Sequence, residues 1–416
     1  MGLKRRIAWL FVVVWLFIYI FQLPLIRIPM LYISNFITLM YVLLYSRYIK
    51  LNRQIISIVK GFLPFFIYFI FQMTLITLSN GTKEAYAENV RYVIMYTVAL
   101  IIAVSFIVTL INKRGFLRDE VLKAIICVGC IQFICVVLSL LFPFVKEFFN
   151  SFIIRNSRSE AVVYSTIAFS GYRSYGFADN LFDQFGYIIS LLIIIVYAYG
   201  LFEKKKVYII FSIAFLVMPL VNARSGLLLS LIGICMASIY YIFVNGFKKI
   251  YKIIAIIILF LLILPVLLNN VSIDTLQWFS DGAKELIAFI FHGDKSGRTI
   301  NQLFNEDLIW PSDMLFGAGG SPNSMGQSGI DVGYVRLVWM FGVIGTILLF
   351  YGYAKMFYIT FKNTNSSAGK AIILSMFVVF FVYLFKLFPI YVPGANMLLF
   401  GIPILFTLTS NNDEEI

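Results

Sequence analysis

Charged residues are scarce in this chain of 416 residues: they make up 13% of it, whereas hydrophobic residues make up 61%. A water-soluble domain of this length needs more polar surface, so the composition excludes one and predicts the bilayer as solvent. The 33 basic residues outnumber the 20 acidic ones, but they lie in short clusters between apolar runs. Such clusters set orientation in a membrane, so we predict no nucleic-acid partner.

Residues for several kinds of chemistry are also missing. The chain has a single histidine, and its four cysteines all fall inside apolar runs. Redox or zinc chemistry at Cys127 and Cys130 is therefore not expected. There is no Walker-type phosphate loop, no dinucleotide-binding glycine motif and no His-Glu-x-x-His zinc motif. We expect neither a metal nor a cofactor.

Long apolar runs dominate what is present. Runs of roughly 20 residues, the length of a helix that crosses a bilayer, occur about twelve times. We therefore predict an all-α fold, a polytopic transmembrane helix bundle in which residues 1–416 form a single membrane domain. The predicted spans lie near residues 7–25, 28–46, 61–78, 91–111, 121–142, 183–202, 207–222, 226–244, 250–269, 333–354, 370–388 and 393–409.

Basic clusters fall in every second connection between these spans. Lys4-Arg5-Arg6 precedes the first span, Lys113 and Arg114 follow the fourth, and Lys204-Lys205-Lys206 follow the sixth. Because positive residues stay on the cytoplasmic side, both termini are predicted to be cytoplasmic. The expected location is the inner membrane of a bacterium.

Two connections on the outer side, residues 143–182 and 270–332, are too long to be simple turns, so function is expected there. The second begins with an amphipathic stripe that predicts an interfacial helix. A short helix is then predicted from Arg298 to Trp310, and a glycine-rich stretch follows. In that stretch Gly319 could bring its backbone N–H close to an anion or a sugar.

An enzyme acting at the outer surface has no ATP or nucleotide sugar available, so its substrate must carry its own activation. A lipid-linked pyrophosphate sugar fits, because its sugar bond is already activated and its lipid tail stays in the bilayer. The chemistry needs cations for the departing pyrophosphate, a base for the attacking hydroxyl and aromatic groups for the sugars. Arginine suits the first task, since its planar fork matches phosphate oxygens.

Three outer arginines are candidates for holding pyrophosphate. Arg224 lies in a very short turn between two spans, where a charge is costly without a partner; the alternative is snorkelling to the membrane surface. Arg173 lies between Tyr172 and Tyr175, which suits sugar stacking and phosphate pairing, or else an ordinary aromatic belt. Arg298 opens the short helix of the second loop, where a salt bridge with an acidic neighbour is the alternative.

The entrance to the tenth predicted span holds a candidate base. Asp331 stands there, followed by Tyr334 and by Arg336, which lies near or within the membrane. A carboxylate beside an intramembrane arginine predicts a functional site, although Asp331 could also cap the helix. His292 is a weaker candidate, since it ends the interfacial helix.

Several of these residues together resemble a family, the O-antigen polymerases and the related O-antigen ligases. The resemblance lies in the Arg224-Ser225-Gly226 turn, in residues 171–180 and in the block from Gly297 to Gly345. It implies metal-independent transfer of a growing glycan from undecaprenyl pyrophosphate to another lipid-linked repeat unit of O-antigen or capsule. The implied partners are undecaprenyl-pyrophosphate-linked glycans, the bilayer, a chain-length regulator and a flippase.

The same resemblance implies roles for individual residues. Arg224 and Arg298 match arginines that face the pyrophosphate, and Arg173 matches more loosely. The ligases carry a histidine near the position of Asp331, so the aspartate favours a polymerase. By analogy Asp331 assists the acceptor hydroxyl in a single inverting displacement. Open alternatives are a ligase-type or capsule-attaching transferase and a flippase or secondary transporter, which should show repeats and broken helices.

Overall fold

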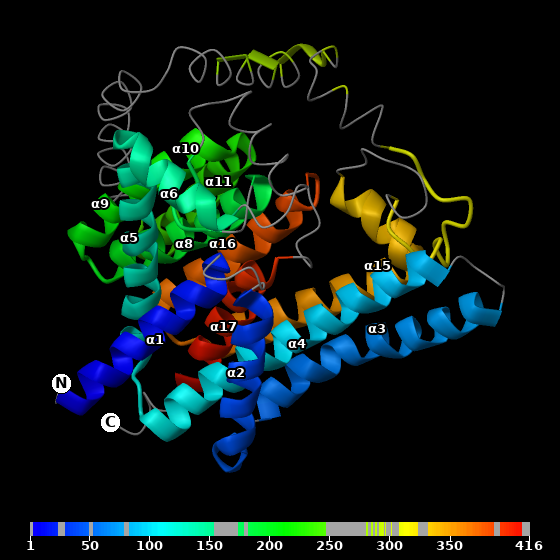
Figure 1. Cartoon of the computed structure of the whole chain (residues 1–416), viewed down its shortest axis with the longest axis horizontal. Coiled ribbons are helices and arrows are strands. Elements are labelled where there is room, and N and C mark those ends of the chain that lie inside the picture. The colour runs from blue at the N-terminus through cyan, green and yellow to red at the C-terminus, as the bar shows by residue number, and fades with distance from the viewer. Residues whose placement is uncertain are drawn as a thin grey trace.

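The computed structural model describes most of the chain. It covers residues 3–23, 30–49, 53–78, 83–153, 174–178, 182–246, 308–322, 332–386 and 392–409, and a few residues between 280 and 301. Within these ranges the regular structure is entirely helical (Figure 1). The predicted all-α class is therefore confirmed for the described residues.

Eleven of the predicted spans coincide with helices, and the span predicted at 250–269 lies outside the described residues. The elements are α1 (Leu3–Phe21), α2 (Met30–Leu44), the 3-10 turn η1 (Ser46–Tyr48), α3 (Arg53–Leu78), α4 (Lys83–Arg114), α5 (Arg118–Leu141), α6 (Pro143–Ile153), α8 (Phe182–Phe202), α9 (Lys206–Phe215), α10 (Val217–Asn222), α11 (Arg224–Asn245), α15 (Gly333–Asn363), α16 (Ser367–Tyr383) and α17 (Pro393–Thr409).

Among the described residues, six helices are long and apolar enough to cross a membrane: α3, α4, α5, α8, α11 and α15. Shorter apolar stretches occur in α2, in α9 with α10, in α16 and in α17. The α1 helix is apolar after a first turn that carries Lys4, Arg5 and Arg6. The fold is therefore that of a helical multi-pass membrane protein.

The helices at the edge of the bundle are apolar on both faces. On α3, Phe62, Phe65 and Phe69 are buried against the bundle. The opposite face leaves Ile67 and Ile70 59% and 66% exposed. A helix that is hydrophobic all round belongs in lipid rather than in water.

The centre of the bundle is formed by α8 and α17, whose residues are almost all buried. Figure 1 shows α17 in the middle, with α2 and α3 at the edge. Aromatic rings fill the space around α17, where Phe400 packs against Phe62, Tyr96 and Tyr353. Packing of these large buried rings holds the helices together. The outer faces of the helices do not need to be buried for the bundle to be stable.

One end of the bundle contains the starts of α1 and α5 and the end of α17. We call it the N-terminal end. The Arg5 guanidinium forms a 2.6 Å ion pair with Glu120 and donates to the Gly115 carbonyl. Arg118 lies over the Phe406 ring. The first residues of α1 and the last turns of α17 therefore lie at the same end of the bundle (Figure 1).

The α15 helix is broken at Gly342, whose φ of 65° and ψ of 177° are not helical. Residues 313–319 fill the break: the backbone N–H groups of Ala318 and Gly319 donate to the Trp339 carbonyl. In return, the Val343 N–H donates to the Met314 carbonyl. The glycine-rich stretch therefore satisfies backbone groups that the break releases, as a membrane interior requires.

Two details differ from the sequence prediction. The span predicted at 207–222 consists of α9 and α10, which are separated at Leu216; the ring of Pro219 is incompatible with a helical bond to the carbonyl four residues earlier. The short helix predicted to reach Trp310 does not do so, because Leu308–Trp310 are not helical. Pro311 disfavours helix before it, and the Ile309 carbonyl instead accepts a bond from the Trp339 indole.

Candidate functional site

The starts of α8 and α11 lie side by side at the end of the bundle opposite the N-terminal end. We call this opposite end the far end. The Ser225 hydroxyl, in the first turn of α11, donates to the Asp183 carboxylate in the first turn of α8. Gly186 and Gly226 face each other directly below this bond and bring the two backbones into contact. Small residues permit such close crossings in membrane bundles.

Residues 174–178 are anchored in the same place. The Asn222 side chain accepts from the Ser174 N–H at 2.9 Å and donates to the Ser174 carbonyl at 2.6 Å. Tyr175 is buried; its carbonyl accepts from Gln132 on α5 and its ring meets Phe185 edge-on. Ser174, which follows Arg173 in the chain, is therefore hydrogen-bonded to Asn222, which lies two residues before Arg224.

The start of α15 and the end of α16 complete the far end. The Tyr334 hydroxyl donates to the Phe381 carbonyl at 2.8 Å, and the Tyr334 N–H donates to the Leu384 carbonyl. Tyr383 of α16 stacks on Tyr187 of α8, with ring centroids 3.9 Å apart and an angle of 6° between the planes. The polar atoms of Tyr334 therefore join the start of α15 to the end of α16.

Charges of both signs converge on Tyr383. Its hydroxyl lies within electrostatic range of the Asp183 carboxylate and of the Arg336 guanidinium. We call Asp183, Tyr187, Ser225, Arg336 and Tyr383 the far-end polar cluster. It places a carboxylate, an arginine and hydroxyl groups from four helices at one end of an apolar bundle, where a polar substrate with a lipid tail could be held.

The structure brings together only some of the sequence-predicted residues. Tyr175, Tyr334 and Arg336 lie at the far end, as described above. Arg224 is the first residue of α11, in the turn that carries Ser225, but its side chain is outside the described part. Four further predicted site residues, Tyr172, Arg173, Arg298 and Asp331, lie outside the described residues.

Gly319 has its polar backbone atoms engaged within the protein. Its N–H donates to the Trp339 carbonyl, and its own carbonyl accepts from the Asn89 amide at 3.2 Å. Gln72 acts in parallel, since its amide donates to the carbonyls of Phe316 and Met340. The predicted contact of the Gly319 N–H with a substrate stays a prediction, and the structural role described here is additional to it.

Sequence reasoning missed Asp183, Ser225 and Tyr383. Asp183 stands at the first position of the predicted span 183–202, and a carboxylate at that place is itself a signal of function. Tyr383 gives no such signal, because tyrosines are frequent in this chain, which has 25 of them. Only the packing of α8 against α16 distinguishes it.

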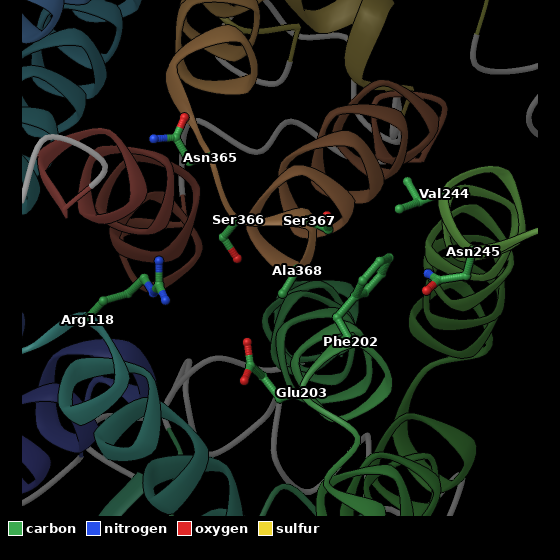
Figure 2. A pocket seen from close by; sticks show the side chains of 9 residues that line it. All are labelled: Arg118, Phe202, Glu203, Val244, Asn245, Asn365, Ser366, Ser367 and Ala368. Atoms are coloured by element: carbon green, nitrogen blue, oxygen red, sulfur yellow. The ribbon is translucent and has the colours of Figure 1, made fainter. Parts of the chain in front are cut away.

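A polar hollow of about 420 Å³ lies at the N-terminal end, away from the far-end polar cluster (Figure 2). Figure 2 shows Arg118 of α5 and Glu203, which follows α8, on one side, with Val244 and Asn245 of α11 on the other. The start of α16 closes it with Ser366, whose side chain accepts from the Gly369 N–H. None of the sequence-predicted site residues in the described part of the chain lines this hollow.

Asp294 and Lys146, in connections between the spans, have shifted pKa values. Hydrogen bonds from Ser296, above all from its backbone N–H, lower the pKa of the exposed Asp294 carboxyl. Desolvation lowers the pKa of Lys146 on α6. His292 is exposed beside Asp294. Within the described residues, no group of three or more histidine, cysteine or acidic side chains could hold a metal ion.

Comparison of the chain with family models, with curated proteins and with solved structures finds no match. The function is therefore inferred from the residues and their geometry.

Proposed function

We propose that the protein polymerises lipid-linked oligosaccharide repeat units of O-antigen or capsular polysaccharide. It transfers the growing glycan from undecaprenyl pyrophosphate to the sugar of an acceptor unit. The observation that carries this proposal is the far-end polar cluster, where Asp183 and Arg336 converge from different helices beside the first turn of α11. That turn begins with Arg224.

The chemistry follows from the residue types. The departing pyrophosphate gains negative charge during the transfer. Arginines placed at the membrane surface stabilise this charge within the site, in place of water. Arg224, Arg298 and Arg173 are proposed for this task, with Tyr172, Tyr175, Tyr334, Arg336 and Gly319 near the sugars. A carboxylate, predicted from the sequence to be Asp331, takes the proton of the acceptor hydroxyl. Neither a metal nor a nucleotide takes part.

The positions of the helix ends support twelve spans. The α11 helix begins at the far end beside Asp183, and its last residue, Asn245, lines the hollow at the N-terminal end. The α15 helix begins at the far end beside Leu384. The twelve-span proposal accounts for this change of end by one crossing between residues 246 and 332, and the apolar run 250–269 is long enough for it.

Twelve spans place both termini on one side, and the basic clusters near Arg5, Arg118 and Lys205 lie at that end. By the positive-inside rule it is the cytoplasmic side. The far-end polar cluster then faces outward, where lipid-linked repeat units are assembled into polymers. The proposed location is the inner membrane of a bacterium.

A flippase or transporter is the second candidate, and the break of α15 at Gly342 is the observation that favours it. Broken helices are characteristic of transport sites near the middle of the bilayer. Here, however, residues 313–319 of the chain itself fill the break and form hydrogen bonds with its backbone groups. This favours a fixed structure over a moving gate.

The test is polymer formation by the purified protein in liposomes. The substrate is the undecaprenyl-pyrophosphate-linked repeat unit extracted from the cell that makes the protein, with no added nucleotide or metal. We expect a ladder of longer glycans that Arg224→Ala abolishes. The matched control is Arg114→Ala at the N-terminal end, where the side chain is exposed; it should leave the ladder unchanged.

Each other result contradicts the proposal in a defined way. A ladder that survives Arg224→Ala would remove this arginine from the site. Movement of the lipid-linked unit across the bilayer without a ladder would indicate the flippase. Transfer to a lipid A core acceptor but not to a second repeat unit would indicate a ligase.

A further inference from the structure

The carboxylate of Asp183 is held in position by a hydrogen bond to one of its two oxygens. Within the described part of the chain its hydrogen-bond partner is the Ser225 hydroxyl, which engages one carboxylate oxygen. The side chain is partly exposed, so its second oxygen can accept a proton from outside the bundle.

A buried hydroxyl group lies near this carboxylate. Tyr383 is fully buried and stacked on Tyr187, and its hydroxyl lies within electrostatic range of Asp183 but has no hydrogen-bond partner among the described residues. A buried hydroxyl without a partner is costly, so this atom indicates that a polar occupant, such as a sugar hydroxyl or water, belongs near Asp183.

The charged and titratable groups around Asp183 come from every helix packed there. Tyr187 lies on its own helix, Tyr383 on α16 and Arg336 on α15. Arg224 begins α11 directly before Ser225. Asp183 is therefore the carboxylate of a polar cluster to which four helices contribute.

Asp183 also has a structural role. It lies in the first turn of α8, where the helix dipole favours a negative charge, and the Ser225 hydroxyl donates to it. A carboxylate fixed in this way, with its second oxygen available, also has the geometry that a general base needs.

We propose that Asp183 is the catalytic base of the transfer, in place of Asp331. This rests on the proposed function. The acceptor hydroxyl oxygen forms a bond to the anomeric carbon of the donor glycan, and its proton passes to the free oxygen of Asp183. The bond from the anomeric carbon to the pyrophosphate oxygen breaks, and undecaprenyl pyrophosphate leaves with that electron pair. Ser225 fixes the carboxylate, and the configuration at the anomeric carbon inverts.

The test compares three variants in the liposome assay described above. Asp183→Asn keeps the bond with Ser225 but removes the base, so we expect the initial rate of glycan extension to fall by about 10²- to 10⁴-fold. Ser225→Ala keeps the carboxylate and loses only its positioning, so the fall should be less than about tenfold. Arg114→Ala, at the N-terminal end, is the control and should extend glycans at the wild-type rate. Thermal unfolding and binding of the lipid-linked donor should be unchanged in Asp183→Asn.

Opposite results overturn the assignment. It is wrong if Asp183→Asn extends glycans within a few fold of the wild type, or if Ser225→Ala loses as much activity as Asp183→Asn. If Asp183→Asn does not fold, the pair Asp183→Glu and Asp183→Gln carries the same test, since only the first should keep activity. A wild type that forms no ladder would contradict the proposed function itself, so the two failures are distinguishable.

Discussion

At the scale of single residues, glycine decides how closely α8 and α11 can cross at the far end. A Cβ atom at Gly226 would lie 2.5 Å from the Cα of Gly186 and 2.8 Å from its carbonyl carbon. These are backbone atoms of a buried helix, so they cannot turn aside as a side chain could. The crossing, and with it the Asp183–Ser225 bond, depends on the missing side chains.

We therefore predict that Gly226→Ala destabilises the protein by about 1 to 3 kcal/mol through overpacking. Thermal unfolding in detergent should show a lower midpoint. Gly401→Ala on α17 is the matched control, because its Cβ would meet Ile107 at an ordinary 3.4 Å, and alanine favours a helix over glycine. Equal midpoints for the two variants would show that the crossing tolerates a methyl group.

The sequence predicts residues of the site where their own position is unusual. Arg224 could be predicted because a charge between two closely spaced spans is costly. The Asp183–Ser225 pair could not, because its members are 42 residues apart and no spacing rule connects them. The stacking of Tyr187 on Tyr383 is likewise a product of helix packing and not of sequence pattern.

At the scale of elements, the break of α15 is held open by amides from two other helices. Gln72 of α3 and Asn89 of α4 both donate to the Met340 carbonyl, at 3.0 and 3.2 Å. Each also donates to the segment in the break, at Phe316 and Gly319 respectively. The two side chains therefore clamp residues 313–319 against α15, on the chain segment that leads to Asp331.

The shared acceptor leads to a prediction about non-additivity. In Gln72→Met or Asn89→Leu alone, one amide still joins Met340 to the segment in the break; in the double variant neither amide does. The double variant should therefore be destabilised by more than the sum of the single variants, with a coupling energy of about 0.5 to 3 kcal/mol.

The measurement is a double-mutant cycle of thermal unfolding in detergent. Thr77→Val on α3 serves as the control, since its exposed hydroxyl donates to the Met73 carbonyl within its own helix. Effects that simply add would mean that Met340 does not depend on the two amides.

The helices themselves were largely predictable, whereas the break was not. Apolar length predicts a membrane helix without reference to any other segment, which is why α3, α8 and α15 follow their predicted spans. Gly342 lies within an apolar run and only the insertion of residues 313–319 gives it a positive φ. That insertion depends on Gln72 and Asn89, which lie more than 200 residues earlier in the chain.

At the scale of the whole molecule, the two ends of the bundle differ in character. The N-terminal end carries Arg5, Arg118 and the polar hollow, and the far end carries the far-end polar cluster and α6. Rings of α6 at Phe149 and Phe152 pack on Phe177 of the anchored 174–178 segment. Since the outer faces of α1 and α3 are apolar, the membrane surrounds the bundle between these ends.

This arrangement predicts which residues are reached from outside the cell. In a cysteine-free background, Ser151→Cys on α6 and Ser312→Cys should react with a membrane-impermeant maleimide added to intact spheroplasts. Ser46→Cys and Asn365→Cys, at the N-terminal end, should react only after the membrane is permeabilised. All four wild-type residues are exposed in the structure, so burial within the protein does not produce the difference.

The two outer positions also test the number of spans. Ser151 and Ser312 are separated by α8, by α9 with α10, by α11 and by residues 247–307. They share a side only if the last segment crosses the bilayer once, as a helix at 250–269 would. If Ser151→Cys is labelled from outside but Ser312→Cys only after permeabilisation, the twelve-span topology is wrong. The far-end polar cluster and residues 308–322 would then lie on opposite sides of the membrane.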